Sequence, residues 1–476
     1  MKAATVIALA GSALLAGCAV GPNYKAPKTS VPAHWASSLA GGETNGPAEL
    51  AAWWREFGDS NLDLLITSAV QSNHTLRIAE AHVREARAER DVAFGRLWPS
   101  VGSTVAYSRN RWPQNSFFAL PPERADYNLY NAAFDAAWEL DVFGGARRAL
   151  QAAGAEVGVA EAGQRGVLIS LLAEVARNYI ESRGYQQRLA IARENIGVQK
   201  DALDLTRSRY RSGLANDLDV QQAEALLSAT ESQVPSLETG FAEAVHHLSV
   251  LLGQPPGTMM DEMSVQKPIP LTPPAVPVGL PSELLERRPD IQSAERELAA
   301  ATARIGVAKA DLFPKFSLIG FAGLESISAD NWFDWSSHYW TAGPTMRWEL
   351  FEAGRIRARI RVQNARQEQA LEAYEQTVLV ALEDSENALV AYAREQTRRE
   401  SLLRSVQADQ QAVELSKQLY KSGLVDFLHV LDSERSLYVA QEALVLSEQG
   451  ISLDLVQLYK ALGGGWQAEM NVTQHP

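Results

Sequence analysis

Two long stretches of the chain carry mostly apolar residues at every seventh position. The first reads Leu168, Val175, Ser182, Leu189, Ile196, Leu203 and Tyr210, and the second reads Val378, Ser385, Tyr392, Arg399, Val406, Val413 and Tyr420. A seven-residue period sustained over this length is typical of long helices packed as coiled coils. Because a glycine follows each stretch and the apolar spacing then resumes, the pattern predicts two long helical hairpins.

Two shorter segments switch to a period of two. Even positions are apolar or aromatic in 130–142 and in 340–350, apart from Pro344, while the odd positions are mainly polar or charged. A strand of a membrane barrel needs this alternation over about 9–11 residues, with apolar side chains toward lipid and polar ones toward a lumen. We place partner strands, with less regular alternation, at 101–109 and 316–324. The edge of a soluble sandwich is the alternative for these strands alone.

The chain also repeats itself. Tyr210-Arg211-Ser212-Gly213-Leu214 returns as Tyr420-Lys421-Ser422-Gly423-Leu424, a shift of 210 residues that also carries Trp138-Glu139-Leu140 onto Trp348-Glu349-Leu350. A duplication of this kind predicts the same ordered parts in both halves. We therefore divide the chain into a signal peptide (1–17), a lipidated N-terminal arm (18–60), a first repeat (61–253), a Pro-rich linker (254–281), a second repeat (282–465) and a C-terminal tail (466–476).

The N-terminus has the features of a bacterial lipoprotein signal. An apolar run follows Lys2 and ends in Leu15-Ala16-Gly17-Cys18, and Cys18 is the only cysteine in the chain. The run is too short for a spanning helix, and the small residues before Cys18 suit a signal peptidase. We expect a covalent lipid on Cys18 and no other cofactor. Ala19 in the next position resembles lipoproteins that are sorted to the outer membrane.

Composition excludes several classes of function. The formal net charge is −13, which argues against nucleic acid as a partner and against binding to anionic lipid by charge. After the signal, the sequence has no uncharged apolar stretch long enough for a spanning helix, so strands must make any crossing. It contains no phosphate loop and no zinc-protease motif, and His246-His247 lacks an evident third metal ligand. We do not expect an enzyme.

The number of predicted strands sets the expected assembly. Each chain supplies four strands, whereas the smallest membrane barrels have about eight. Two chains would give a barrel filled by its own side chains, and three would give twelve strands with an open lumen. The predicted fold is therefore an α-helical tunnel plus a membrane β-barrel, closed by a homotrimer whose helical hairpins stand side by side.

Several motifs resemble the TolC-like outer-membrane efflux lipoproteins, the OprM-type outer membrane factors of tripartite RND efflux systems. They are Leu284-Leu285-Glu286-Arg287-Arg288-Pro289-Asp290-Ile291, Trp138-Glu139-Leu140-Asp141-Val142-Phe143-Gly144-Gly145 and Leu458-Tyr459-Lys460-Ala461-Leu462-Gly463-Gly464-Gly465-Trp466. The resemblance runs from Cys18 to about Trp466. It implies a trimeric passive channel for drugs or other small molecules. The channel would lie in the outer membrane, extend into the periplasm, and receive its cargo from an inner-membrane proton-driven pump through a periplasmic adaptor.

The resemblance also places the working residues at the hairpin ends. Matched to the family, the constriction that closes the periplasmic end corresponds to Leu428 and Asp432, with Arg435 beside them. Their spacing of four and three puts all three on one helix face. The first repeat has Leu218, Gln222 and Ala225 instead, so it lacks both charges. The adaptor-docking tips correspond to Arg209, Arg211, Gly213, Leu214, Lys421, Gly423 and Leu424.

Other functions stay open at this point. Within the channel class, the alternatives to small-molecule efflux are metal-ion efflux and type I protein secretion. A lipid-anchored periplasmic coiled-coil scaffold is more distant, because pump adaptors have one hairpin between β-rich flanks, whereas this chain has two hairpins and two strand pairs. The sequence does not identify the cargo, the pump or the adaptor.

Overall fold

The structure is a computed structural model that describes residues 19–37, 43–44, 50–115, 117, 121–122, 125–270, 272 and 276–467. The predicted signal peptide, the predicted lipidation site Cys18 and most of the predicted tail lie outside these residues. The chain divides into two compact units. Unit 1 comprises Met1–Lys28, His82–Ala160 and Ser293–Tyr374, and unit 2 comprises Thr29–Ala81, Glu161–Gln292 and Glu375–Pro476. Within the described ranges, no helix is both long and apolar enough to cross a membrane.

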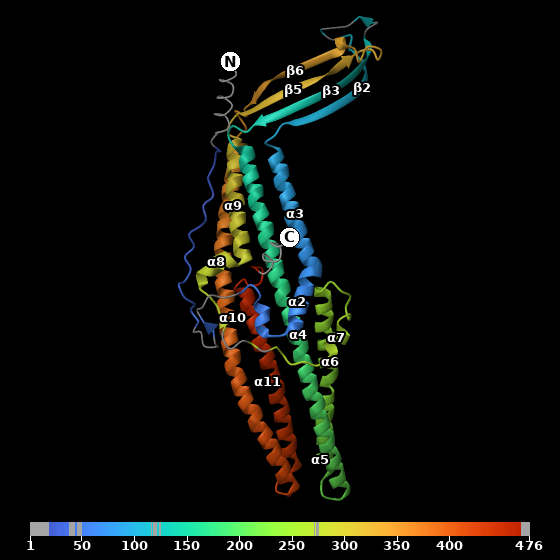
Figure 1. The fold of residues 1–476 in the computed structure, drawn as a ribbon, viewed down its shortest axis with the longest axis vertical. Helices are drawn as coiled ribbons and strands as arrows, with labels where there is room; N and C mark the ends of the chain where they lie inside the picture. The colour runs from blue at the N-terminus through green and yellow to red at the C-terminus, as the bar shows by residue number, and fades with distance from the viewer. Residues whose placement is uncertain are drawn as a thin grey trace. The chain divides into compact units, whose positions relative to one another are not determined.

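Unit 1 contains an antiparallel sheet of four strands in the order β2-β3-β5-β6 (Figure 1). The strands are β2 (Ser100–Arg111), β3 (Asp126–Leu140), β5 (Lys315–Ser326) and β6 (His338–Arg347). All four predicted strands are thus confirmed, although the alternation had extended β3 to Val142 and β6 to Leu350. β6 ends at Arg347 because its partner in the register, Lys315, follows Pro314 directly, and proline has no N–H to donate to a longer ladder.

The same hydrogen bond joins a helix end to a strand end in both repeats. α3 (His74–Gly95) leads into β2, and α9 (Pro289–Ala310) leads into β5. The indole of Trp138 donates to the Leu97 carbonyl at 2.9 Å, and the indole of Trp348 donates to the Leu312 carbonyl at 3.1 Å. Leu97 and Leu312 lie in the turns two residues beyond these helices, so each tryptophan links the turn after a helix to the end of a strand.

The two long predicted helices are present. α4 (Gly145–Arg211) and α10 (Arg355–Lys421) each contain 67 residues. The helices that return from their ends differ. α11 (Phe427–Ala461) is continuous, whereas the first return helix is divided at Ser232 into α5 (Asp217–Glu231) and α6 (Gln233–Leu251). Pro235 explains the division, because it has no N–H to bond to the preceding turn.

Apolar residues at a spacing of three and four predict one helix from Leu62 to Leu97, and this prediction is wrong. α2 (Ser60–Ser72) ends at Asn73, which has extended backbone, and α3 begins after it. The Asn73 side chain accepts the Leu76 N–H at 2.9 Å and donates to the Leu251 carbonyl at 2.9 Å. An asparagine that caps the next helix in this way stabilises the break, and the apolar spacing on both sides of the break conceals it.

The Pro-rich linker (254–281) is expected from its many prolines to be irregular, and this is correct only in part. It contains the short helix α7 (Met260–Ser264), and β4 (Val276–Pro277) pairs in parallel with β1 (Glu43–Thr44) of the N-terminal arm. η3 (Pro281–Glu283) and α8 (Leu284–Arg287) follow it. Two-residue strands carry no periodicity, so the sequence pattern could not reveal this pair.

The N-terminal arm docks on unit 2 at two tryptophans. The adjacent tryptophans Trp53-Trp54 predict a docking point of the arm. Trp53, in the 3₁₀ turn η1 (Trp53–Phe57), is fully buried and stacks on Tyr459 at 5.3 Å between ring centres, as this prediction requires. A docking point that the sequence did not indicate comes earlier. Trp35 is buried and its indole donates to the Gly279 carbonyl at 2.9 Å, so the arm is already attached before Trp53.

Candidate gate at the hairpin tips

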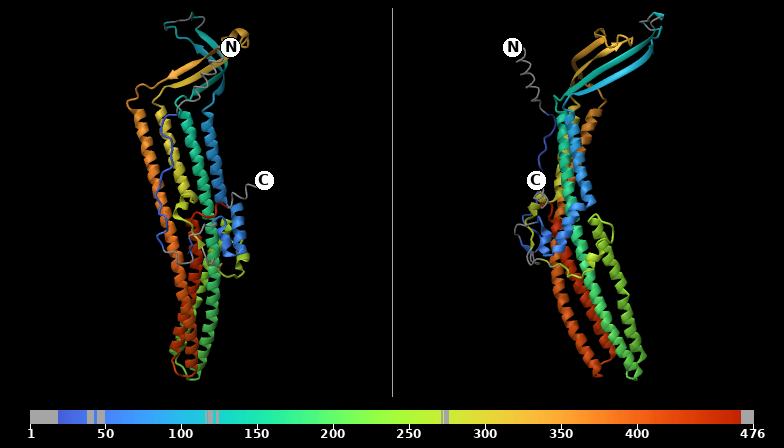
Figure 2. Two further views of the ribbon diagram at one scale, coloured as in Figure 1. Left: turned by 60° about the vertical axis from the view of Figure 1, so that its left-hand side comes forward. Right: turned by 45° about the vertical axis from the view of Figure 1, so that its right-hand side comes forward.

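Both hairpins of unit 2 turn through the same backbone motif. Gly213 and Gly423 have φ angles of +74° and +76°. The N–H of Leu214 donates to the Arg209 carbonyl at 2.8 Å, and that of Leu424 donates to the Leu419 carbonyl at 3.0 Å. These are Schellman ends, in which the glycine takes a conformation that other residues rarely adopt. Figure 2 shows the two tips at the same end of the unit from two sides.

The helices that leave the two tips begin differently. Asn216 and Asp219 form a capping box at the start of α5, with the Asn216 side chain accepting the Asp219 N–H at 2.9 Å. α11 begins after Asp426, whose side chain makes no capping hydrogen bond. A cap of this kind contributes about 1 kcal/mol to the helix end, so the first turn of α11 is held less firmly than that of α5.

The three predicted gate residues lie on one exposed stripe of α11. Leu428 is 57% exposed, and the side chains of Asp432 and Arg435 are exposed by 61% and 66%. The Arg435 guanidinium donates to the Asp432 carboxylate at 2.6 Å. The structure thus brings the three together as the spacing predicted. Their role in closing a channel stays a prediction.

The opposite face of the same turns is buried and holds an acid that the sequence did not indicate. Glu434 is only 3% exposed, and its carboxylate lies 2.9 Å from the ammonium of Lys417 on α10. The repeat was a usable signal for this pair. A shift of 210 carries Lys417 and Glu434 onto Arg207 and Glu224, which form an ion pair at 3.1 Å in the first hairpin.

Six of the seven predicted docking residues are exposed at the two tips: Arg211, Gly213, Leu214, Lys421, Gly423 and Leu424. Arg209 differs, because its guanidinium lies 4.4 Å from the centre of the Tyr420 ring and donates to the Tyr420 carbonyl at 3.4 Å. Burial raises the pKa of the Tyr420 phenol, and the charge of Arg209 opposes this shift. Arg209 therefore lies at a tip and also connects the two hairpins.

Below the tips the two hairpins share an apolar core. Leu203 of α4 and Val220, Ala223 and Leu227 of α5 pack with Tyr420, Phe427, Val430 and Leu431 of the second hairpin. Farther from the tip, hydrogen bonds between polar side chains also connect the two hairpins. Arg188 donates to Glu442 at 2.6 Å, Asn195 donates to Gln441 at 3.2 Å, and Tyr438 donates to Gln233 at 2.6 Å. Within one chain the hairpins are therefore firmly attached to each other.

A half-buried acid on α11 responds to pH. Burial raises the pKa of Asp454 from 3.8 to about 6, and the nearby charge of Glu395 adds to the shift. In the first repeat the same position holds Ala244, so packing alone does not require an acid there. Because the folded state binds the proton more tightly than the unfolded state, stability falls as the pH rises from about 4 to 6 and stays reduced above that range.

We therefore expect Asp454→Asn to stabilise the protein at pH 7.5 but not at pH 4. A shift of two pKa units corresponds to about 3 kcal/mol, and solvent screening of the partly exposed group reduces this to about 1–2 kcal/mol. Thermal unfolding in detergent at the two pH values measures the difference. Asp201→Asn, on an exposed turn of α4, is the control and should change little at either pH. An equal gain for Asp454→Asn at both pH values would contradict the assignment.

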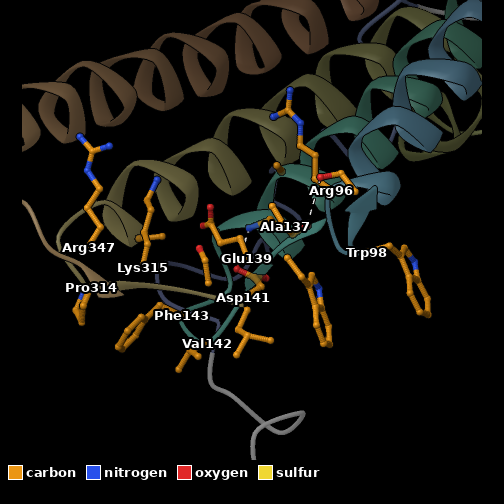
Figure 3. A pocket seen from close by; sticks show the side chains of 18 of the residues that line it. Arg96, Trp98, Ala137, Glu139, Asp141, Val142, Phe143, Pro314, Lys315 and Arg347 are labelled. Carbon is orange, nitrogen blue, oxygen red and sulfur yellow. Dashed lines mark hydrogen bonds between the residues drawn. The ribbon is translucent and has the colours of Figure 1, made fainter. Parts of the chain in front are cut away.

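Unit 1 has a hollow of about 790 Å³ where the strands meet the helices. Arg96, Glu139, Lys315 and Arg347 line it, together with aromatic residues such as Trp98 and Phe143. In Figure 3 the side chains of Arg96, Lys315 and Arg347 point to one side, and those of Trp98 and Phe143 point to the other. The base of the sheet thus has a charged side and an aromatic side.

Comparison with known proteins identifies the family. The model of the outer membrane efflux protein family matches residues 65–254 and 280–464. The chain belongs to this family. It is 32% identical over 460 residues to the pyoverdine export outer membrane protein OpmQ of Pseudomonas aeruginosa, with 96% of each chain covered. It is 31% identical over 464 residues to nodulation protein T of Rhizobium leguminosarum bv. trifolii, again with 96% of each covered.

Solved structures give the same result. The outer-membrane channel OprN has a TM-score of 0.88 and 37% identity over 94% of this chain and 100% of its own. The open state of the MtrE outer membrane channel of Neisseria gonorrhoeae has a TM-score of 0.83 and 27% identity over 95% of this chain and 99% of its own. The predicted family is confirmed, and the structural neighbours are outer-membrane channels. The protein is an outer-membrane efflux channel located in the outer membrane and extending into the periplasm.

Proposed function

We propose that three copies of the chain form one channel, with a twelve-stranded barrel in the membrane and a helical tunnel in the periplasm. The observation that carries this proposal is the open-edged sheet. Within the described residues β2 pairs only with β3, and β6 pairs only with β5. In lipid, each backbone group without a partner costs several kcal/mol, so both edges need a strand from another chain.

The difference between the two faces of the sheet supports the proposal that its polar face lines the lumen. Polar residues such as Asn131, Asp135 and Glu139 alternate along β3 with apolar ones such as Phe134 and Trp138. In a membrane barrel the polar side faces the lumen, and aromatic residues gather at the membrane surfaces. We assign the charged side of the hollow in Figure 3 to the channel interior and its aromatic side to the lipid boundary.

The hairpin tips form the periplasmic entrance in this proposal. Three copies of the Leu428, Asp432 and Arg435 stripe meet at the axis, where the leucines form an apolar constriction and the aspartates form a hydrated acidic ring. A periplasmic adaptor docks on the exposed tip residues, namely Arg211, Gly213, Leu214, Lys421, Gly423 and Leu424, with Arg209 behind them. An inner-membrane pump driven by protons supplies the cargo. Relatives named for toluene efflux and pyoverdine export support small organic molecules as that cargo.

The start of the arm supports a lipid on Cys18. Arg148 is 4% exposed and donates to the carbonyls of Ala19, Val20 and Gly21 at 3.4, 3.1 and 3.3 Å. The Val20 N–H donates to the Phe143 carbonyl at 3.0 Å, beside the end of β3. The residues that follow Cys18 are thus fixed at the aromatic base of the sheet, where a lipid would enter the membrane.

We expect Cys18→Ala to abolish the covalent lipid. Intact mass spectrometry of the membrane-extracted protein should show a lipidated mass for the native chain and loss of the acyl groups in the variant. Because several acyl chains at about 0.8 kcal/mol per buried methylene anchor a protein firmly, the variant depends on its barrel alone to stay in the membrane. A native mass without lipid would contradict the proposal for Cys18.

Reconstitution tests the proposed channel. Purified full-length protein in planar lipid bilayers should give stepwise currents, and expression together with a matching pump and adaptor should restore drug resistance to a strain that lacks its own outer-membrane channel. A protein that gives no current and restores no resistance would contradict the proposed function. A monomer tethered by its lipid would produce this result.

A further inference from the structure

We infer that charges exchanged between the two repeats determine how copies of the chain join, so that α10 of one copy binds α3 of the next. The inference rests on the proposed trimeric channel and names the residues that recognise a second copy. We call the surface between α10 of one copy and α3 of the next the seam. Its residues follow from the equivalent contact inside the chain, between α4 and α9.

The order of the strands determines which helices meet at the seam. Inside the chain β3 pairs with β5, and because β3 leads into α4 and α9 leads into β5, α4 lies beside α9 (Figure 1). The two open edges of the sheet are β6, which leads into α10, and β2, which α3 precedes. A shared barrel pairs these edges between copies. The seam is therefore the counterpart of the contact between α4 and α9.

The repeat matches the two helix pairs residue by residue. α4 and α10 both contain 67 residues, and a shift of 210 carries Gly145–Arg211 onto Arg355–Lys421. α3 and α9 both contain 22 residues, and a shift of 215 carries His74–Gly95 onto Pro289–Ala310. Each shift holds at both ends of its helices. A contact between α4 and α9 therefore indicates which residues of α10 and α3 lie opposite each other at the seam.

An ion pair of unit 1 has its charges exchanged at the seam. Glu156 of α4 forms an ion pair with Arg304 of α9. The two shifts place Arg366 of α10 at the position of the acid and Glu89 of α3 at the position of the base. Both side chains are exposed in the single chain, and neither forms an ion pair with another described residue. Arg366 of one copy therefore pairs with Glu89 of the partner subunit, in the opposite polarity.

A polar contact of unit 2 becomes a second ion pair. Arg165 of α4 donates to the side-chain carbonyl of Gln292 of α9 at 2.8 Å. Their counterparts are Glu375 of α10 and Arg77 of α3, both exposed in the single chain. Arg77 donates to the Gln71 carbonyl at 2.9 Å, and a guanidinium has further N–H groups for a carboxylate. Glu375 of one copy therefore pairs with the partner's Arg77.

The exchanged charges discriminate against wrong pairings of the helices. If α3 took the place of α9, Glu89 would lie against Glu156, and if α9 took the place of α3, Arg304 would lie against Arg366. Like charges brought together in this way disfavour the wrong partner more than opposite charges favour the right one. Each helix of the chain is therefore directed to one neighbour, and the copies join in a single order.

Side-chain size supports the same order in unit 1. Gly306 of α9 lies so close to Arg148 of α4 that an added Cβ would be 2.7 Å from the Cγ of Arg148. The counterpart of Gly306 on α3 is Asp91, which has no room beside Arg148. At the seam the counterpart of Arg148 is Ala358, whose small side chain leaves space for the partner's Asp91. Large and small residues are thus exchanged as the charges are.

Paired cysteines linked by a bismaleimide locate the contact in the full-length protein in outer membranes. Arg366→Cys with Glu89→Cys should give covalent dimers and trimers on denaturing gels. The matched pair inside the chain, Glu156→Cys with Arg304→Cys, should react without joining chains. Each seam cysteine alone, and the protein without added cysteines, should stay monomeric on the same gels and thereby control for the reagent and for Cys18.

Charge reversal tests whether the ion pair recognises the partner. Arg366→Glu alone places two acids against each other at every seam, and Glu89→Arg alone places two bases there. We expect each single variant to lower the fraction of trimer that survives mild heating in detergent several-fold, because three seams are affected at once. The two substitutions together restore opposite charges and should return this fraction to the native value. Native mass spectrometry measures it.

Two results would overturn the inference while the proposed channel stands. The first is a seam cysteine pair that yields only monomers on denaturing gels although the unaltered protein is a trimer. The second is a charge-reversed double variant that loses as much trimer as the single variants do. Failure of the proposed function looks different, because the unaltered protein would then be monomeric and give no current in bilayers.

Discussion

Replacing Asp432 and Arg435 together by alanine is expected to raise the closed-state conductance of the channel several-fold in planar bilayers. In the proposed trimer, three exposed copies of this pair, each with its guanidinium 2.6 Å from its carboxylate, would lie at the narrowest part of the tip. The alanines remove both the side chains that narrow the opening and the bond that fixes their position. Single-channel recording of native and variant protein measures the effect.

The first repeat provides the matched control for this experiment. Gln222 occupies the position equivalent to Asp432, and Ala225 already stands at the position of Arg435. Gln222→Ala should therefore leave the closed-state current as it is. If the double alanine variant conducts no better than the native protein, Asp432 and Arg435 do not form the gate.

Replacing Arg288 by alanine is expected to cost about 2–3 kcal/mol of stability, because the buried guanidinium's charge-assisted hydrogen bonds are lost while the two carboxylates, 48% and 42% exposed, regain water. Arg288 is 8% exposed and donates to Asp290 at 2.7 Å, to Asp384 at 3.0 Å and to the carbonyl of Ala461 at 3.0 Å. It thus joins the start of α9 to α10 and to the end of α11. Thermal or urea unfolding in detergent, and the yield of assembled protein, measure the loss.

Substitution of the neighbouring Arg287 is the control that distinguishes the network around buried Arg288 from a surface ion pair. Arg287 lies next to Arg288 in the chain, but its guanidinium is partly exposed and bonds only Glu283 at 2.9 Å among the ion pairs of the described residues. Arg287→Ala should cost less than about 1 kcal/mol, as surface ion pairs do. Equal losses for the two variants would show that the buried network does not stabilise this junction.

The helices and strands whose apolar pattern repeats over many residues were predictable from the sequence. The heptads predicted the long helices that end at Arg211 and Lys421, because a periodic signal over many turns averages out single exceptions. The strands were found for the same reason. The features that the sequence did not reveal depend on single residues: Asn73 interrupts a helix by capping the next one, Pro235 divides another, and Pro314 shortens β6 through its partner strand.

The candidate gate was predictable to a similar extent. Spacing placed Leu428, Asp432 and Arg435 on one face, and the structure keeps them on one exposed stripe. The face behind them was not foreseen. Glu434 reads as an ordinary surface charge in the sequence, but Lys417 lies beside it in the fold, and Arg209 lies over Tyr420. These contacts join residues that are far apart in the chain, so no local pattern reports them.

The number of chains in the assembly tests the central claim most directly. Four strands with two open edges close a conducting barrel only if chains combine, and three chains give the twelve strands that leave a lumen. Native mass spectrometry of the protein extracted from outer membranes measures this number. We expect the mass of three chains, each with its lipid. A mass of one or two chains would contradict the trimeric channel and with it the gate at the hairpin tips.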